Sequence, residues 1–95
     1  MKNHPESVKQ QIEKSLEIDL SGNLEDALTF YINHLIQNDF QKLVSLLYKI
    51  DVDEGKLKRI LRENPGKDAA DIIAHLIIER ELQKIETRKL FKGKK

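Results

Sequence analysis

Apolar residues along this chain recur at intervals of three and four, the spacing that places them on one face of an α-helix. The first such stripe has one member at every fourth position: Val8, Ile12, Leu16 and Leu20. Pro5 suits the first turn of a helix, where a backbone N–H is not needed, and Ser21-Gly22 suits its end. We therefore predict a first helix over residues 5–20, whose narrow stripe packs weakly.

Wider stripes predict a second and a third helix. Asn23 is a suitable N-cap. The apolar residues that follow it fall within about half of a helix's circumference: Leu24, Ala27, Leu28, Tyr31, Ile32, Leu35 and Ile36. Asn38 and Asp39 interrupt this pattern, so a new helix from Phe40 to Ile50 is predicted in place of one long rod. Its apolar residues cover more than half of its circumference, and we expect it to be the central, most buried element.

Polar residues mark the starts of two further helices. Asp51 or Asp53 can cap a short fourth helix, which Asn64-Pro65-Gly66 ends. Asp68 opens a fifth helix, and no helix breaker follows before Gly93. At about 1.5 Å per residue this last helix reaches roughly 35 Å, so we expect its end to project from the body. The pattern predicts an all-α fold, a single compact bundle of four to five helices with a long C-terminal helix.

The apolar stripe of the fifth helix changes sides near residue 78. Residues up to Ile77 occupy one face, whereas Ile78, Leu82 and Ile85 lie on nearly the opposite face. One interpretation is that this second stripe packs against the first helix, whose own stripe otherwise lacks a partner. The other is that it forms, together with Phe91, an interface with another chain, most simply in a symmetric homodimer. The sequence leaves both alternatives open.

Composition predicts one small globular domain over residues 1–95. The chain has 17 Lys and Arg against 16 Asp and Glu, and no cysteine. The lack of cysteine fits a reducing compartment and excludes disulfides. Since neither a signal peptide nor an apolar run long enough for a membrane span is visible, we expect a cytoplasmic protein with no membrane partner. The last twelve residues hold six bases and one acid, and we expect residues 88–95 to be a basic, frayed tail.

Residues suited to catalysis do not form a recognisable constellation. No serine stands beside a histidine or in a glycine-bordered turn, and no phosphate-binding glycine motif occurs. Asp71, His75 and Glu79 follow each other at intervals of four, a spacing that can hold a divalent ion, although such ladders are typical of solvated faces. We therefore expect no enzyme activity, no cofactor, no metal site and no small-molecule ligand.

Arg80 is expected to be a structural residue. It lies in line with Ile73 and Ile77, so its stem should be covered and its guanidinium should find a carboxylate. Asp39 and Asp51, at the two ends of the third helix, are candidate partners. Tyr48 likewise needs a hydrogen-bond partner if its ring is buried. A polar network of Arg80, Asp39, Asp51 and Tyr48 is therefore predicted.

Basic residues keep nucleic-acid binding as an alternative. Lys58, Arg59 and Arg62 share the outward face of the fourth helix, and Lys89 and Lys92 lie in the basic tail. The net charge of only +1 provides little attraction to phosphate. The turn before the fourth helix lacks the glycine usual in helix-turn-helix proteins, and we expect a longer connection than theirs. We therefore do not expect nucleic acid to be the main partner.

Two stretches resemble a family of small, all-helical bacterial proteins: DFQKLVSLLYKIDVDEGKLKRIL (residues 39–61) and IIAHLIIERELQKIETR (residues 72–88). This resemblance implies a bacterial, cytoplasmic setting, and it carries no activity, cofactor or catalytic residue. The function that we expect is a small, non-enzymatic protein-interaction or adaptor domain that binds another protein or itself as a homodimer. The alternative is a weak nucleic-acid-binding module that uses the fourth helix and the basic tail.

Overall fold

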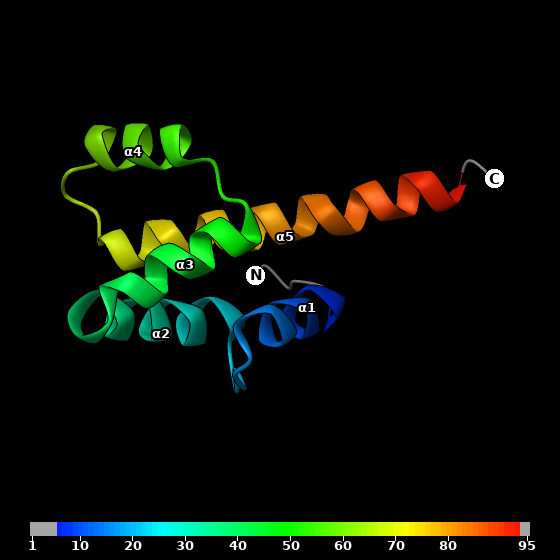
Figure 1. Cartoon of the computed structure of the whole chain (residues 1–95), viewed down its shortest axis with the longest axis horizontal. Helices are drawn as coiled ribbons and strands as arrows, with labels where there is room; N and C mark the ends of the chain where they lie inside the picture. Colours follow the sequence, from blue (N-terminus) through cyan, green and yellow to red (C-terminus); the bar gives the residue numbers. More distant parts are fainter. Residues whose placement is uncertain (1–5, 94–95) are drawn as a thin grey trace.

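The computed structural model describes the backbone of residues 6–93 and the side chains of residues 8–88. Short loops join its helices: α1 (Glu6–Leu16), α2 (Leu24–Asn38), α3 (Phe40–Ile50), α4 (Glu54–Glu63) and α5 (Ala69–Gly93). Residues 6–93 contain no strand. The prediction of an all-α bundle with a long C-terminal helix is confirmed (Figure 1).

Helix α5 is the central element, because it packs against each of the other four helices. Ala70, Ala74 and Ile77 on α5 are almost completely buried. The most extensive packing is with α2, whose Leu28 and Ile32 are also inaccessible to solvent. Small alanine side chains on α5 allow another helix to approach closely. The contact between α2 and α5 therefore forms the main part of the core.

The expectation that residues 40–50 form the most buried helix is wrong. Helix α3 buries Leu43, Leu46 and Ile50, but Phe40 and Tyr48 are exposed. Its apolar arc is wide, yet only one side of the arc is buried against the rest of the bundle. An exposed aromatic ring satisfies the same sequence pattern as a buried one. For this reason periodicity alone identified the wrong helix as the central one.

The second half of α5 lies against α1, as one of the two interpretations of its second stripe proposed. Val8, Ile12 and Leu16 of α1 are buried, and α1 contacts α5 and α3. Ile78 and Ile85 of α5 belong to the same hydrophobic cluster. One continuous core therefore joins the narrow stripe of α1 to the rest of the bundle.

The end of α5 projects from the body, as its length leads one to expect. The molecule measures 44 Å along its longest axis and 29 Å along the other two. Figure 1 shows the last turns of α5 extending beyond α1. No helix among residues 6–93 combines the length and apolar character needed to cross a membrane.

Helix α1 is shorter than predicted, because it ends at Leu16 and not at Leu20. Glu17 adopts a left-handed conformation with φ of 58°. The N–H of Ile18 then donates to the carbonyl of Glu13 at 3.2 Å, the hydrogen bond that closes a Schellman motif. Leu20 keeps its place in the core from the loop, where its N–H donates to the Glu13 carboxylate at 2.8 Å.

Glycine at position 17 is expected to stabilise the protein. The left-handed conformation costs a residue with a side chain about 1–2 kcal/mol, and glycine avoids this cost but has more conformational entropy in the unfolded chain. We expect Glu17→Gly to raise the free energy of unfolding by about 0.5–1 kcal/mol, measured by urea denaturation. Glu17→Ala removes the same charge without relieving the backbone, and it should give no such gain.

Polar caps place the other helix starts close to the predicted positions. Asn23 accepts a hydrogen bond from the Asp26 N–H at 3.0 Å at the start of α2. Asp39 caps α3, since its carboxylate accepts from the Lys42 N–H at 3.2 Å. The break between α2 and α3 is therefore confirmed.

Candidate interaction site

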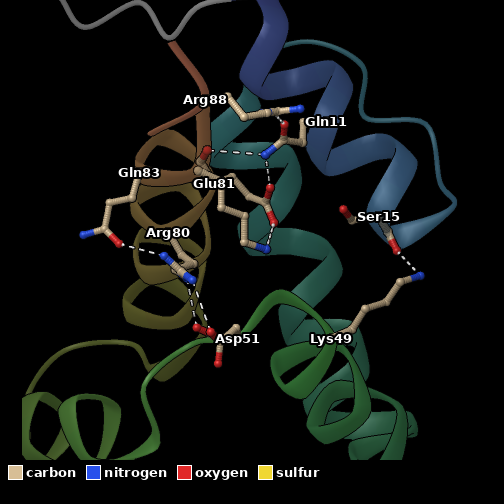
Figure 2. Close-up of polar contacts among 9 residues, drawn as sticks. Gln11, Ser15, Lys49, Asp51, Arg80, Glu81, Gln83 and Arg88 are labelled. Carbon is tan, nitrogen blue, oxygen red and sulfur yellow. Dashed lines mark hydrogen bonds and ion pairs between the residues drawn. The ribbon is translucent and has the colours of Figure 1, made fainter. Parts of the chain in front are cut away.

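Arg80 and Asp51 come together where the turn after α3 meets α5. The Arg80 Nη2 donates to Asp51 Oδ2 at 3.1 Å, and its Nε donates to the Asp51 carbonyl oxygen at 3.1 Å (Figure 2). A third hydrogen bond joins Arg80 Nη1 to Gln83 Oε1 at 3.3 Å. The Asp51 side chain is 79% exposed, so this pair is worth only about 0–1 kcal/mol. Its role is to hold the turn against α5.

The other two residues of the predicted polar network lie outside it. Asp39 is occupied at the N-terminus of α3 by the cap already described. The Tyr48 side chain is 76% exposed, so its hydroxyl has water available and needs no protein partner. The structure thus joins Arg80 to Asp51 and leaves Asp39 and Tyr48 separate.

A buried acid that the sequence analysis did not single out connects α1 to α5. Glu81 is only 1% exposed, and its carboxylate accepts a hydrogen bond from the Gln11 side chain. Lys84 Nζ lies 3.4 Å from the other carboxylate oxygen, and Arg88 donates to the Gln11 side-chain oxygen (Figure 2). Glu81 lies between Ile77 and Ile85 at intervals of four, and this register was the available signal for its burial.

The polar ladder of α5 does not converge on a common point. His75 Nδ1 lies 2.9 Å from the carbonyl oxygen of Asp71 on the preceding turn. Glu79 forms an ion pair with Lys56 of α4 at 3.0 Å. Among the residues described, no three histidine or carboxylate side chains are grouped so that they could hold a metal ion.

The basic residues of α4 are exposed, as their predicted outward position requires. Lys58, Arg59 and Arg62 all lie on the surface, and Lys58 pairs with Glu54 at 3.3 Å. The expected longer connection before α4 is wrong: residues 51–53 alone join α3 to α4, because Asp51 adopts the left-handed conformation usually left to glycine, with φ of 70°. Since α4 packs mainly against α5, the pair does not reproduce a helix-turn-helix. The side chains of Lys89 and Lys92 lie outside the described residues.

Helix α4 should respond locally to the loss of its cap. Asp53 accepts hydrogen bonds from the N–H groups of Gly55 at 2.9 Å and Lys56 at 3.3 Å. No residue of α4 is buried, so the loss of about 1 kcal/mol expected for Asp53→Ala should open α4 without unfolding the bundle. We expect amide hydrogen exchange in α4 to rise about fivefold, while exchange in α2 stays unchanged. Glu63→Ala, at the other end of the helix, is the control.

Most of the described residues of the proposed interface are covered within the chain itself. Ile78 is 3% exposed and Ile85 is 9% exposed, and both pack in the core. Leu82 is partly buried against the same core. The Phe91 side chain lies outside the described residues. Among Ile78, Leu82 and Ile85, only Leu82 therefore offers appreciable surface to a second chain.

An apolar groove lies between α2 and the loop of residues 17–23 that precedes it. We call it the α2 groove, and its apolar and aromatic lining residues are Ile18, Leu20, Ala27, Phe30, Tyr31 and His34. Ile18, Ala27 and Tyr31 also pack against the core, so the floor of the groove is anchored. Phe30 is the exception, with 78% of its surface exposed. The open space is about 750 Å³, within the range of ligand pockets.

Apart from His34, the polar residues that line the α2 groove are acidic or uncharged. Asp19 and Asp26 lie on its rim together with Ser21 and Asn23, and no lysine or arginine is among the described residues that line it. The Tyr31 hydroxyl oxygen is buried, and it has no hydrogen-bond partner among the described residues. A buried hydroxyl without a partner is unfavourable, so this wall of the groove has a polar atom to be satisfied.

Comparisons of the chain with protein families, with curated proteins and with solved structures found no match. The α2 groove is therefore interpreted from the residues of this chain alone. Its apolar floor, exposed phenyl ring and acidic rim are features of a surface suited to binding another molecule.

Proposed function

We propose that this chain is a non-enzymatic protein-interaction domain and that the α2 groove receives its partner. The observation that carries the proposal is Phe30, a phenyl ring 78% exposed beside an apolar groove. Aromatic side chains next to a pocket are typical of the residues that dominate binding energy in protein interfaces. The lack of cysteine fits a reducing compartment, and the cytoplasm is the place where we propose that the chain acts.

The groove favours a partner segment that is helical, apolar on one face and basic. An amphipathic helix places apolar side chains in a groove of this kind. Asp19 and Asp26 on the rim favour positive charge on the incoming segment and disfavour negative charge.

Pull-down from the native cell with matched variants tests this function. We expect the wild type to retain one or more proteins, which can include further copies of the chain. Phe30→Ala should fail to retain them. Phe40 is also exposed but does not line the groove, so Phe40→Ala should retain them. The proposal is wrong if the wild type and Phe30→Ala retain the same proteins, or if the wild type retains none.

A second candidate function is weak nucleic-acid binding by α4 and the basic tail. It is supported by the exposure of Lys58, Arg59 and Arg62 on a helix that buries no residue. Phosphate contacts make such binding strongly salt-dependent. A mobility shift that disappears in Arg59→Ala/Arg62→Ala, and weakens when Lys89 and Lys92 are replaced, would favour it over the first candidate. The absence of any shift at low salt would exclude it.

A further inference from the structure

We propose that the α2 groove binds the C-terminal end of α5 from a second copy of the chain. This inference rests on the proposed function and deepens it by naming the partner. Each chain has one α2 groove and one C-terminal end, so two copies can satisfy each other by reciprocal exchange.

Charge and hydrophobicity of the two surfaces are complementary. Residues 89–95, KLFKGKK, contain four lysines and no acid, and they include Leu90 and Phe91. The α2 groove has an apolar lining with an acidic rim, and none of its described lining residues is a lysine or arginine. Leu90 and Phe91 supply apolar surface for the groove and for Phe30, while the lysines supply charge opposite to that of Asp19 and Asp26.

The geometry of α5 points to a second copy as the occupant. Helix α5 continues unbroken from Ala69 to Gly93 and leads away from the body. In Figure 1 the loop that borders the groove lies at the bottom of the view, and the C-terminal end of α5 lies at the far right. A chain can bring its own end to its own groove only by breaking α5, whereas another copy presents the same end without distortion.

The Tyr31 hydroxyl provides a second, independent reason for an incoming polar group. Its oxygen has no partner among the described residues and belongs to a side chain that lines the groove. A lysine ammonium group is a donor, and a tyrosine oxygen can accept from it. A lysine of residues 89–95 bound in the groove is a donor of the kind that this oxygen lacks.

Charge reversal in the full-length chain tests the pairing. Sedimentation equilibrium over a concentration series should show that the wild type self-associates. Asp19→Lys/Asp26→Lys and Lys89→Glu/Lys92→Glu should each weaken association about tenfold at low salt, because each places like charges together. An equimolar mixture of the two variants should associate at nearly wild-type strength, since the reversed charges are again opposite.

The controls separate this pairing from other forms of association. Lys58→Glu/Arg62→Glu reverses two exposed charges on α4, outside the groove, and should associate like the wild type. Circular dichroism verifies that each variant remains helical. A wild type that stays monomeric at high concentration, or a mixture that fails to recover association, would overturn the pairing. If the Phe30-dependent capture of another protein persists in that case, the proposed function survives and only this partner is wrong.

Discussion

Replacement of Ile77 by alanine is expected to destabilise the protein more than any other single truncation considered. Ile77 is completely buried, and it lies on the helix that packs against each of the other four. Loss of three carbon atoms from such a site removes apolar contacts and leaves a cavity, which costs about 2–5 kcal/mol. Domains of this size have a total stability of about 5–15 kcal/mol, so the variant should lose a large share of it.

Urea denaturation of Ile77→Ala beside Ile60→Ala measures this effect. Ile60 lies on α4, is only half-buried and is not part of the hydrophobic core. The same chemical change there should cost less than about 1 kcal/mol, because less surface is lost and no cavity is enclosed. Equal losses in the two variants would contradict the central position of α5.

Glu81→Ala is expected to have the second largest effect, and its comparison with Glu81→Leu is the more informative result. Alanine leaves a cavity and removes the acceptor for the Gln11 side chain and the partner of Lys84. We expect a loss of about 2–4 kcal/mol. Leucine fills the space, and replacement of a buried ionic group by an apolar one is often neutral or stabilising. The Leu variant should therefore lie within about 1 kcal/mol of the wild type.

Thermal and urea denaturation of the two Glu81 variants show whether Glu81 stabilises the protein by filling space or by its hydrogen bonds. Gln11 and Lys84 are half-exposed, so in Glu81→Leu both side chains can turn towards water. A Leu variant as unstable as the Ala variant would show that α1 depends on the hydrogen bonds of Glu81 and not on filled space. Thr87→Leu, on the exposed side of the same helix, is a control for the added leucine.

Local features of the fold could be predicted from the sequence because they depend on neighbouring residues. Asn23 and Asp53 cap the helices that follow them, since a cap needs only a short polar side chain next to free N–H groups. The end of α1 was misplaced because Glu17, and no glycine, takes the left-handed conformation there. Residue type indicates such a conformation only when it is glycine or, less often, asparagine or aspartate.

Contacts between distant residues could be predicted only in part. Arg80 was recognised by its register on the helix. Its partner could be narrowed only to Asp39 or Asp51, because these two acids stand at the two ends of α3. Glu81 and Gln11 are 70 positions apart, and nothing in either neighbourhood indicates the other. The α2 groove was missed for the same reason: the residues that line it come from a loop and a helix face, and only their packing leaves the space open.

The sequence by itself determined that this protein is helical, where most of its helices begin, and that positive charge gathers at its C-terminal end. These properties follow from periodicity, capping and composition, which act over a few residues. Only the tertiary structure decided that α1 covers the second apolar stripe of α5, and that α5 and not α3 is the central helix. It alone also placed Phe30, exposed, beside a groove. The physical reason is that burial depends on the whole set of competing apolar faces, and a single helix does not specify which of them is left for solvent.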